Sequence, residues 1–375
     1  MKTIFCGLAM SIASFSATAS AVEFTPVTTG KLPQADCGSI ERFSAIMPGE
    51  SVPFIIDVWL PEGYSAASKY PVVYMADGQN LFDADKTFSF AGVAWEIEKK
   101  MAQLVKSGKI PAPAIVVGIN NRGSAGLRMD DYFPEKALDY IPADKWSETY
   151  LPANFRQTCR GDEYAAFVAQ DVKDFVDGRY STLSSREHTF TMGSSMGGLI
   201  SLYIMCEYPE IVGGAACMST HWVGSISASA ANGYTMEDDP VCARAILDYY
   251  DSALPAPGKH ILYLDEGDQG WDAVYVPYNR EMAQIAERHG YSEESGTLMV
   301  KYWTNSGHNE WYWQQHCNVP LEFLLSATLD SGVGEVVEDN SADGEIYDIS
   351  GISRGKDIES LPRGIYCRKG RKFRR

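Results

Sequence analysis

The sequence predicts a single doubly wound α/β domain with a mostly parallel sheet, followed by a short β-rich C-terminal tail. Short apolar and β-branched runs alternate with longer helical stretches from residue 53 to residue 198 and beyond. Runs such as residues 71–75 (PVVYM) are apolar at consecutive positions, which is typical of strands buried on both faces. The composition changes past Thr328 to Gly, Asp, Glu and Ser, which is typical of a linker.

The expected strands and helices take turns along the chain. The strands are predicted at Phe54–Leu60, Val72–Met75, Ile115–Ile119, Thr189–Met192, Gly214–Met218, Ile261–Leu264 and Leu298–Trp303. The helices are predicted at Ala91–Ser107, Asp162–Gly178, Gly197–Tyr208, Val241–Tyr250, Tyr278–His289 and Trp311–Thr328. The 375 residues, 45% of them hydrophobic, suffice for one large domain with appendages.

The first 21 residues are expected to be a secretory signal peptide. Lys2 precedes a short apolar run, residues 3–17, and Ala19-Ser20-Ala21 supplies small residues for cleavage after Ala21. The run is shorter than the roughly 20 apolar residues that span a bilayer. A secreted protein is therefore expected, located in the periplasm, at the cell surface or outside the cell. No transmembrane segment is expected in the mature chain.

The cysteines and the net charge limit the classes of partner. Cleavage would leave seven cysteines, an odd number, so at least one has no partner within the chain; Cys217 is expected to be a small buried hydrophobe. The net charge of −17 argues against nucleic acid as a partner. Residues 351–375 carry nine Lys/Arg and two Asp/Glu, hence +7, so the remainder carries −17 − 7 = −24.

The domain boundaries follow from these shifts in composition. The folded domain is predicted at residues 22–328, a linker at 329–344, and a short basic β-rich tail at 345–375. Residues 122–155 and 219–239 are irregular in pattern, and we expect them to form walls of the site, although solvated loops would have the same composition.

The strongest functional signal is the segment Gly193–Gly198 (GSSMGG), between a predicted strand and a predicted helix. A G-x-S-x-G pentapeptide alone is weak, because it recurs by chance in Gly- and Ser-rich chains. Between a strand and a helix it makes a tight turn that exposes the hydroxyl of the central serine. The sequence therefore predicts Ser195 as a nucleophile, and Ser194 lies one place off the required position.

A serine nucleophile needs a base, which in this chain order follows a carboxylate. His308 lies in a loop after the last predicted strand and is the expected base; His289 is expected to cap a helix, and His316 falls within the final helix. Residues 265–272 offer several carboxylates at a strand end. Asp272 is the first choice for the acid that orients the imidazole, with Asp268 and Asp265 as alternatives.

Other site residues are expected around this triad. A tetrahedral oxyanion needs two preorganised donors, predicted to be the N–H groups of Met196 and Gln79. Trp271 and Trp222 are expected to line the mouth and to stack on a sugar or aromatic acyl group, with His221 as a further substrate contact.

Six motifs stand together in residues 76–313. They are ADGQNLF (76–82), LRMDDYFP (127–134), GDEYAAFVAQDVKDFVDGRY (161–180), TMGSSMGGLISLY (191–203), DEGDQGWDAVY (265–275) and SGHNEWYW (306–313). In this combination the chain resembles the "Putative esterase" or esterase D-like family of α/β-hydrolases, over roughly residues 40–325. That family includes feruloyl and acetylxylan esterases, trilactone siderophore esterases and S-formylglutathione hydrolase.

The resemblance implies an α/β-hydrolase without a metal or other cofactor, with Ser195, Asp272 and His308 at the triad positions. It also implies the N–H groups of Gln79 and Met196 at the oxyanion positions. Relatives commonly carry His where Ala76 stands and Thr where Asp268 stands, so an extra carboxylate lies beside the expected acid. The tail resembles short C-terminal extensions of secreted Bacteroidetes proteins, some of which are sorting signals; an ordinary basic appendage is the alternative.

The predicted function is hydrolysis of carboxylic esters, with acyl or feruloyl esters of carbohydrates as the expected class of substrate. An acyltransferase with the same triad would transfer the acyl group to a sugar hydroxyl. A non-catalytic surface binding module would keep the fold without the chemistry. The sequence does not determine the oligomeric state.

Overall fold

The structure is a computed structural model, and it describes residues 22–83, 92–227 and 237–326 of the main domain. In the tail it describes residues 346–348, 354–357, 361, 365–368 and 371–374. The predicted signal peptide and the predicted linker lie outside the described residues.

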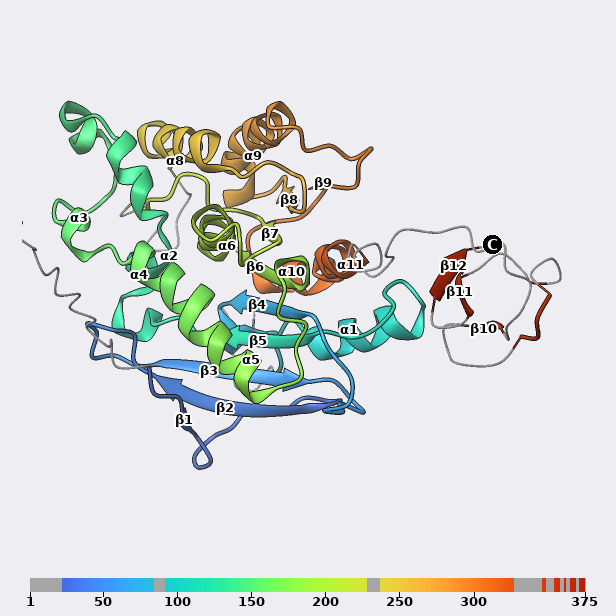
Figure 1. Cartoon of the computed structure of the whole chain (residues 1–375). Helices are drawn as coiled ribbons and strands as arrows, with labels where there is room; N and C mark the ends of the chain where they lie inside the picture. The colour runs from blue at the N-terminus through green and yellow to red at the C-terminus, as the bar shows by residue number, and fades with distance from the viewer. Residues whose placement is uncertain are drawn as a thin grey trace, which may run out of the picture.

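A nine-stranded sheet forms the centre of the domain, in the order β1-β2-β3-β5-β4-β6-β7-β8-β9 (Figure 1). Strands β1, β2 and β3 are antiparallel and β3 also pairs antiparallel with β5, whereas every pair from β5 to β9 is parallel. The strands are β1 (Thr25–Pro26), β2 (Ser39–Ala45), β3 (Phe54–Leu60), β4 (Val72–Ala76), β5 (Ile115–Ile119), β6 (Thr189–Ser194), β7 (Gly214–Met218), β8 (Ile261–Gly267) and β9 (Leu298–Trp303).

Helices cover both faces of this sheet (Figure 1). The α-helices are α1 (Ile97–Lys106), α2 (Arg128–Tyr132), α3 (Phe155–Thr158), α4 (Gly161–Ala166), α5 (Lys173–Arg179), α6 (Met196–Glu207), α8 (Pro240–Ala253), α9 (Trp271–Arg288), α10 (Glu310–His316) and α11 (Asn318–Ser326). Shorter 3₁₀ segments are η1 (Gly78–Asn80), η3 (Gly123–Ala125), η4 (Glu135–Tyr140), η5 (Ala143–Glu148) and η7 (Arg186–His188), and η6 (Phe167–Val172) is a π-helical turn between α4 and α5.

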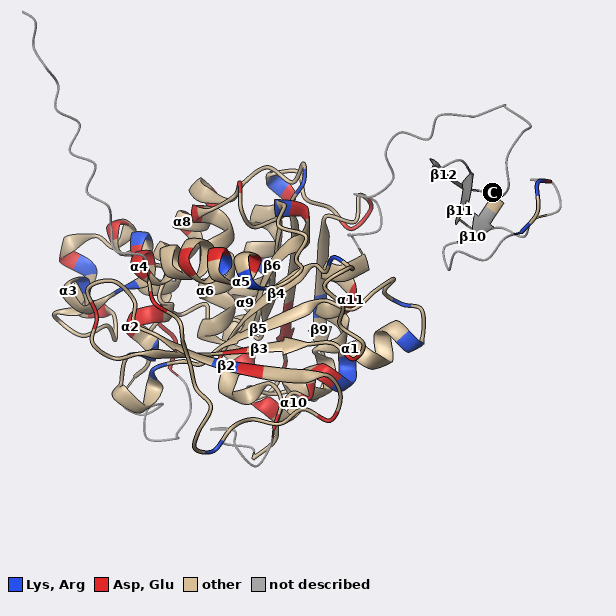
Figure 2. Ribbon diagram, turned by 60° about the horizontal axis from the view of Figure 1, so that its bottom comes forward, with Lys and Arg blue, Asp and Glu red and all other residues tan. Residues whose placement is uncertain are grey.

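Alternation along the strands divides the apolar core into two layers. On β4, Val72 and Tyr74 pack into the layer under α6, α8 and α9, whereas Val73 and Met75 pack into the layer under α1 and α11. The four central strands β4, β5, β6 and β7 carry no charged residue. In Figure 2 the charged residues lie on helices, loops and outer strands such as β2. A sheet buried on both faces is therefore confirmed.

All seven strands predicted from apolar runs are present, but the first two strands of the sheet were missed. Strand β2 (SIERFSA) contains charged residues, and its pairing with β3 places Arg42 opposite Asp57. The Arg42 Nε and Nη2 atoms donate to the two Asp57 carboxylate oxygens at 2.6 and 2.7 Å. The polar side chains of an edge pair hide its strand character from a search for apolar runs.

Three helices differ clearly from their predictions. The helix predicted at Ala91–Ser107 begins only at Ile97, as α1. The helix predicted at Tyr278–His289 begins seven residues earlier, at Trp271, because Pro277 lies inside α9 rather than ahead of it. This places Asp272 in the first turn of a helix, not in a loop. His289 is the C-cap of α9, as predicted, and the final predicted helix is divided into α10 and α11 at Cys317.

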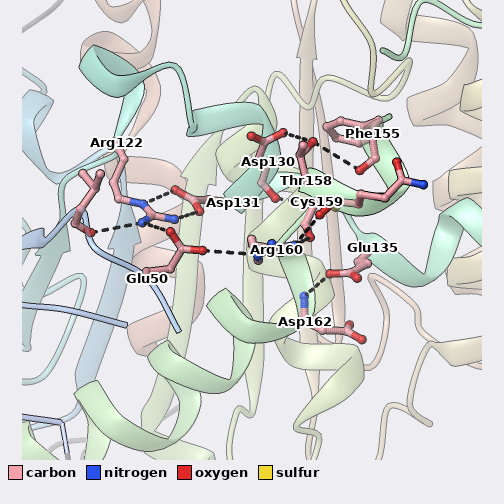
Figure 3. A network of polar contacts seen from close by, with 12 residues as sticks. Glu50, Arg122, Asp130, Asp131, Glu135, Phe155, Thr158, Cys159, Arg160 and Asp162 are labelled. Atoms are coloured by element: carbon pink, nitrogen blue, oxygen red, sulfur yellow. Dashed lines mark hydrogen bonds and ion pairs between the residues drawn. The ribbon is translucent and has the colours of Figure 1, made fainter. Parts of the chain in front are cut away.

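The segment after β5 is anchored to the rest of the domain by a buried ionic network (Figure 3). Arg122, only 3% exposed, donates from Nε to Asp131 at 2.9 Å and from Nη1 to Glu50 at 3.1 Å. Arg160 reaches the other Glu50 oxygen at 3.3 Å, and its backbone N–H donates to the Asp130 carbonyl at 2.8 Å. The network therefore fixes α2 against the loop between β2 and β3.

The tail contains a small antiparallel sheet of its own, in the order β10-β11-β12. Its strands are β10 (Ile346–Asp348), β11 (Ile365–Arg368) and β12 (Arg371–Arg374). Among the described cysteines whose side chains are placed, all six are unpaired thiols, and Cys217 is fully buried as predicted. No helix in the described part of the chain is both long and apolar enough to cross a membrane.

Candidate active site

Ser195 lies at the turn between β6 and α6, with backbone angles of φ 57° and ψ −126°. A non-glycine residue rarely adopts a positive φ, so the surrounding structure must enforce this turn. Gly193 and Gly197 allow it, because a Cβ placed on Gly193 would lie 2.4 Å from the Gly197 carbonyl oxygen. The two glycines of the pentapeptide thus let strand and helix approach, and the serine hydroxyl points away from the turn.

His308 bridges Ser195 and Asp272. Its Nε2 atom lies 2.8 Å from the Ser195 Oγ, and its Nδ1 atom lies 2.6 Å from the Asp272 Oδ1. Three aromatic rings surround the imidazole, with ring centroids 5.6 Å (Trp271), 5.4 Å (Tyr275) and 5.0 Å (Trp313) away. The loop after β9 supplies His308, and these rings leave the imidazole little freedom to turn away from Ser195.

Asp272 is the carboxylate that meets His308, at the start of α9. It is fully buried, and its Oδ2 accepts hydrogen bonds from the Ser219 hydroxyl at 2.9 Å and from the Gly267 N–H at 3.0 Å. Asp265 contacts Tyr263, Trp303 and the Ser219 backbone instead. Asp268 is exposed and accepts from the Ser306 N–H at 3.3 Å. The structure therefore brings only the first of the three predicted carboxylates to the imidazole.

The two predicted oxyanion donors lie in first turns of helical segments. Met196 is the first residue of α6, and Gln79 lies in η1, directly after β4. Backbone N–H groups in a first turn have no intrahelical acceptor, so they remain available to a ligand. The Gln79 side chain is already engaged, because its Oε1 accepts the Asn121 N–H at 3.0 Å. The Gln79 Oε1 is thus occupied by the protein itself, and the predicted oxyanion donor is the Gln79 backbone N–H.

The three residues predicted to contact substrate lie in different surroundings. Trp271 is partly exposed beside His308, as expected for the mouth. Trp222 is fully buried and its Nε1 donates to Asn279 at 3.1 Å, so the prediction that it lines the mouth was wrong. The sequence around a tryptophan in a site loop does not show whether its ring points toward the core or toward solvent.

His221 is also buried, with 1% of its surface exposed. Its Nδ1 lies 2.6 Å from the Tyr275 hydroxyl, and its Nε2 lies 2.9 Å from the Ser225 carbonyl oxygen. Burial, together with the charge of His308, lowers the pKa of His221 to about 3, so this imidazole is neutral. Both ring nitrogens are occupied, so His221 supports the wall behind His308 and does not offer a free contact to substrate.

Three further residues of the site were missed from the sequence. Ser219, at φ 40°, donates its hydroxyl to Asp272 and its N–H to Asp265. Asp77 begins the predicted oxyanion loop, residues 77–81, and forms an ion pair with Arg128, whose Nη2 lies 2.8 Å from the Asp77 Oδ2. Both lie inside motifs of the family resemblance, and the opposite charges in those motifs were the available signal.

The fold and the site together define an α/β-hydrolase of the serine hydrolase class. The family model described as "Putative esterase" matches residues 52–319. This range is well over half of the chain, and the chain belongs to this family of carboxylic ester hydrolases.

Individual relatives are distant. An uncharacterized protein of Bacillus subtilis (strain 168), YjcH, is 23% identical over 164 residues, which is 44% of this chain and 54% of that protein. The chain therefore matches about half the length of this curated relative. A ferulic acid esterase has a similar fold, with a TM-score of 0.55 at 17% identity over 78% of this chain and all of that one. The enterobactin esterase of Shigella flexneri gives 0.51 at 13% identity, over 80% of this chain and 60% of that chain.

Proposed function

We propose that this protein is a secreted serine esterase that hydrolyses carboxylic esters through Ser195, His308 and Asp272. The observation that carries the proposal is the continuous line of contacts from the Ser195 Oγ through the imidazole to the Asp272 carboxylate, at 2.8 and 2.6 Å. A serine hydroxyl is a weak nucleophile near neutral pH, and a neighbouring imidazole that takes its proton removes this limitation.

The first half of the proposed reaction acylates the enzyme. The Ser195 Oγ attacks the ester carbonyl carbon while its proton passes to the His308 Nε2, and Asp272 stabilises the imidazolium through Nδ1–H. The negative charge on the carbonyl oxygen is stabilised by the N–H groups of Met196 and Gln79. The imidazolium then gives its proton to the departing alcohol, which leaves an acyl group on Ser195.

The second half restores the serine. Water gives a proton to the His308 Nε2 as its oxygen attacks the acyl carbonyl carbon, and the same two N–H groups stabilise the charge. The proton returns to the Ser195 Oγ as the acid product leaves. Each oxyanion donor contributes about a hundred- to a thousandfold in rate in enzymes of this type.

Replacement of the nucleophile tests the proposal most directly. Ser195→Ala is expected to lower kcat on p-nitrophenyl acetate by about 10⁵- to 10⁶-fold, because the acyl-enzyme can no longer form. A fluorophosphonate probe should label the wild type and Ser194→Ala but not Ser195→Ala. Activity of Ser195→Ala within tenfold of wild type would overturn the proposal, and an unlabelled wild type would favour a binding module.

Acyl or feruloyl esters of carbohydrates are the proposed class of substrate. The support is the aromatic surface at the site. Trp271 lies beside His308. Trp311, which follows His308 by three residues in the sequence, is 49% exposed. Exposed aromatic faces favour sugar rings and aromatic acyl groups. Comparing kcat/KM on acetyl, feruloyl and trilactone esters tests this class, and a preference for simple short-chain esters would contradict it.

Secretion is proposed from the signal peptide expected at residues 1–21. Intact-mass measurement of the protein expressed at full length in a Gram-negative host should find a chain that begins at Val22. Retention of the first 21 residues in a cytoplasmic product would contradict it.

A further inference from the structure

The oxyanion loop is fastened by an ion pair that the proposed reaction does not itself use. The Arg128 guanidinium donates to both oxygens of Asp77, from Nε at 2.9 Å to Oδ1 and from Nη2 at 2.8 Å to Oδ2. The Asn121 Nδ2 also donates to the Asp77 Oδ1, and the Tyr132 hydroxyl accepts the Asp77 N–H at 3.0 Å. Asp77 is 3% exposed and is thus a buried carboxylate with paired oxygens.

Asp77 occupies a strained backbone position two residues before Gln79. Its φ of 56° and ψ of 43° lie in the left-handed region, which a residue other than glycine rarely adopts. Such a conformation persists only where its surroundings hold it. Four hydrogen bonds do so here, three accepted by the Asp77 carboxylate and one donated by its N–H. They thereby set the direction in which η1 presents the Gln79 N–H.

The Asp77 carboxylate also lies against the start of the nucleophile helix. A Cβ placed on Gly197 would lie 3.3 Å from the Asp77 Oδ2, and Gly197 directly follows the oxyanion donor Met196. A negative charge here would compete with the oxyanion for the positive end of α6 and would repel it. The Arg128 charge offsets that repulsion, and arginine is charged at every pH of interest.

The partner that supplies this charge is itself held in place. Arg128 begins α2, which also contains Asp131 and Tyr132, and Asp131 is bound by Arg122 in the buried network of Figure 3. The Arg128 guanidinium lies over the Tyr132 ring, 5.2 Å from its centroid. At the other end of the loop, the Asn80 Nδ2 donates to the Glu310 Oε1 at 3.3 Å.

From these contacts we infer that Arg128 is a positioning residue for ester hydrolysis: it fixes the turn at Asp77 and cancels the Asp77 charge beside the oxyanion. The inference rests on the proposed esterase function. It predicts a loss in kcat when Arg128 is removed, because the charge that needs stabilising develops only in the transition state. It also predicts that removal of the Asp77 charge restores part of that loss.

The test is a double-mutant cycle on p-nitrophenyl acetate, with kcat and KM measured for each protein. Arg128→Met is expected to lower kcat about 10²- to 10³-fold, the effect of a lost oxyanion donor, with KM changed less than about threefold. Arg128→Lys keeps the charge without the bidentate geometry and should lose only about tenfold. The double variant Asp77→Asn/Arg128→Met should recover at least about tenfold over Arg128→Met.

A matched control comes from the same segment between β5 and α4. Arg156 pairs with Asp139 at 3.2 Å and lies over Trp146, away from the oxyanion loop, so Arg156→Met should keep kcat within about twofold. Three outcomes would overturn the inference: kcat of Arg128→Met within threefold of wild type, a double variant no faster than the single one, or a rise in KM at unchanged kcat. The last would make Arg128 a substrate contact.

A second measurement separates this inference from the proposed function. If wild type and Ser195→Ala are equally inactive on esters, the proposed function fails. Hydrogen exchange followed by mass spectrometry then decides the positioning role: exchange at residues 77–81 should be faster in Arg128→Met than in wild type and unchanged in Arg156→Met. Unchanged exchange in Arg128→Met would overturn the positioning role whatever the activity.

Discussion

Two buried aspartates, Asp265 near the end of β8 and Asp272 in the first turn of α9, have similar hydrogen bonding and different surroundings. Asp265 and Asp272 are both no more than 1% exposed, and each accepts three hydrogen bonds. Ser219 serves both, with its N–H to Asp265 and its hydroxyl to Asp272. Burial and hydrogen bonding alone therefore do not distinguish an acid that takes part in catalysis.

The difference lies in the third partner. Asp272 meets an imidazole, which becomes cationic during the proposed reaction, whereas Asp265 meets the Tyr263 hydroxyl and the Trp303 indole, which stay neutral. Without a cation, burial dominates and raises the pKa of Asp265 to about 6, against the hydrogen bonds from Trp303, Tyr263 and Ser219. From this comparison we expect effects of decreasing size on activity for substitutions at Asp272, Asp265 and Asp268.

The largest effect is expected for Asp272→Asn. The amide keeps the shape of the side chain but neither orients the required tautomer nor stabilises the imidazolium, so kcat on p-nitrophenyl acetate should fall by about 10⁴-fold. Far-ultraviolet circular dichroism should show an unchanged fold. A loss of less than tenfold would mean that another group orients His308.

Asp265→Asn should act on stability more than on catalysis, with kcat within about tenfold of wild type because Asp265 does not touch His308. The folded-state pKa of Asp265, about 6, lies above its ordinary value of 3.8. The folded protein therefore binds this proton more tightly than the unfolded chain, and the stability that it contributes is lost as the pH rises from about 4 to about 6.

Urea unfolding at pH 4 and at pH 7 measures this effect. The free energy of unfolding of wild type, taken relative to that of Asp265→Asn, should fall by about 2–3 kcal/mol between the two pH values. The same relative value at both pH values would contradict a raised pKa at Asp265, and a kcat as low as that of Asp272→Asn would end the distinction between the two carboxylates.

The smallest effect is expected for Asp268→Ala, the exposed carboxylate between the other two. It accepts from the Ser306 N–H at 3.3 Å and from the neighbouring Gln269 side chain, and neither group belongs to the triad. The variant should keep kcat within about threefold and unfold within about 0.5 kcal/mol of wild type. A tenfold loss of kcat would show that the Ser306 contact helps to place the His308 loop.

Several parts of this site could be predicted from the sequence because they depend on local patterns. Ser195 stands between small residues at a strand end, and His308 follows the last apolar run. The buried parallel strands could be predicted because they form continuous apolar runs in the sequence. The buried Trp222 and His221 were misjudged, since position in a loop says nothing about the direction of a side chain.

The sequence by itself determined the class of fold, a single candidate nucleophile and a short set of candidate acids. Only the tertiary structure distinguished Asp272 from Asp265 and Asp268. Because α9 begins at Trp271, Asp272 lies in its first turn and contacts His308. Asp265 lies on β8 and contacts Tyr263 and Trp303 instead. The pairing of Asp77 with Arg128, 51 residues away, was likewise decided there. Contacts between distant segments depend on packing, and opposite charges in two local motifs do not show which residues pair.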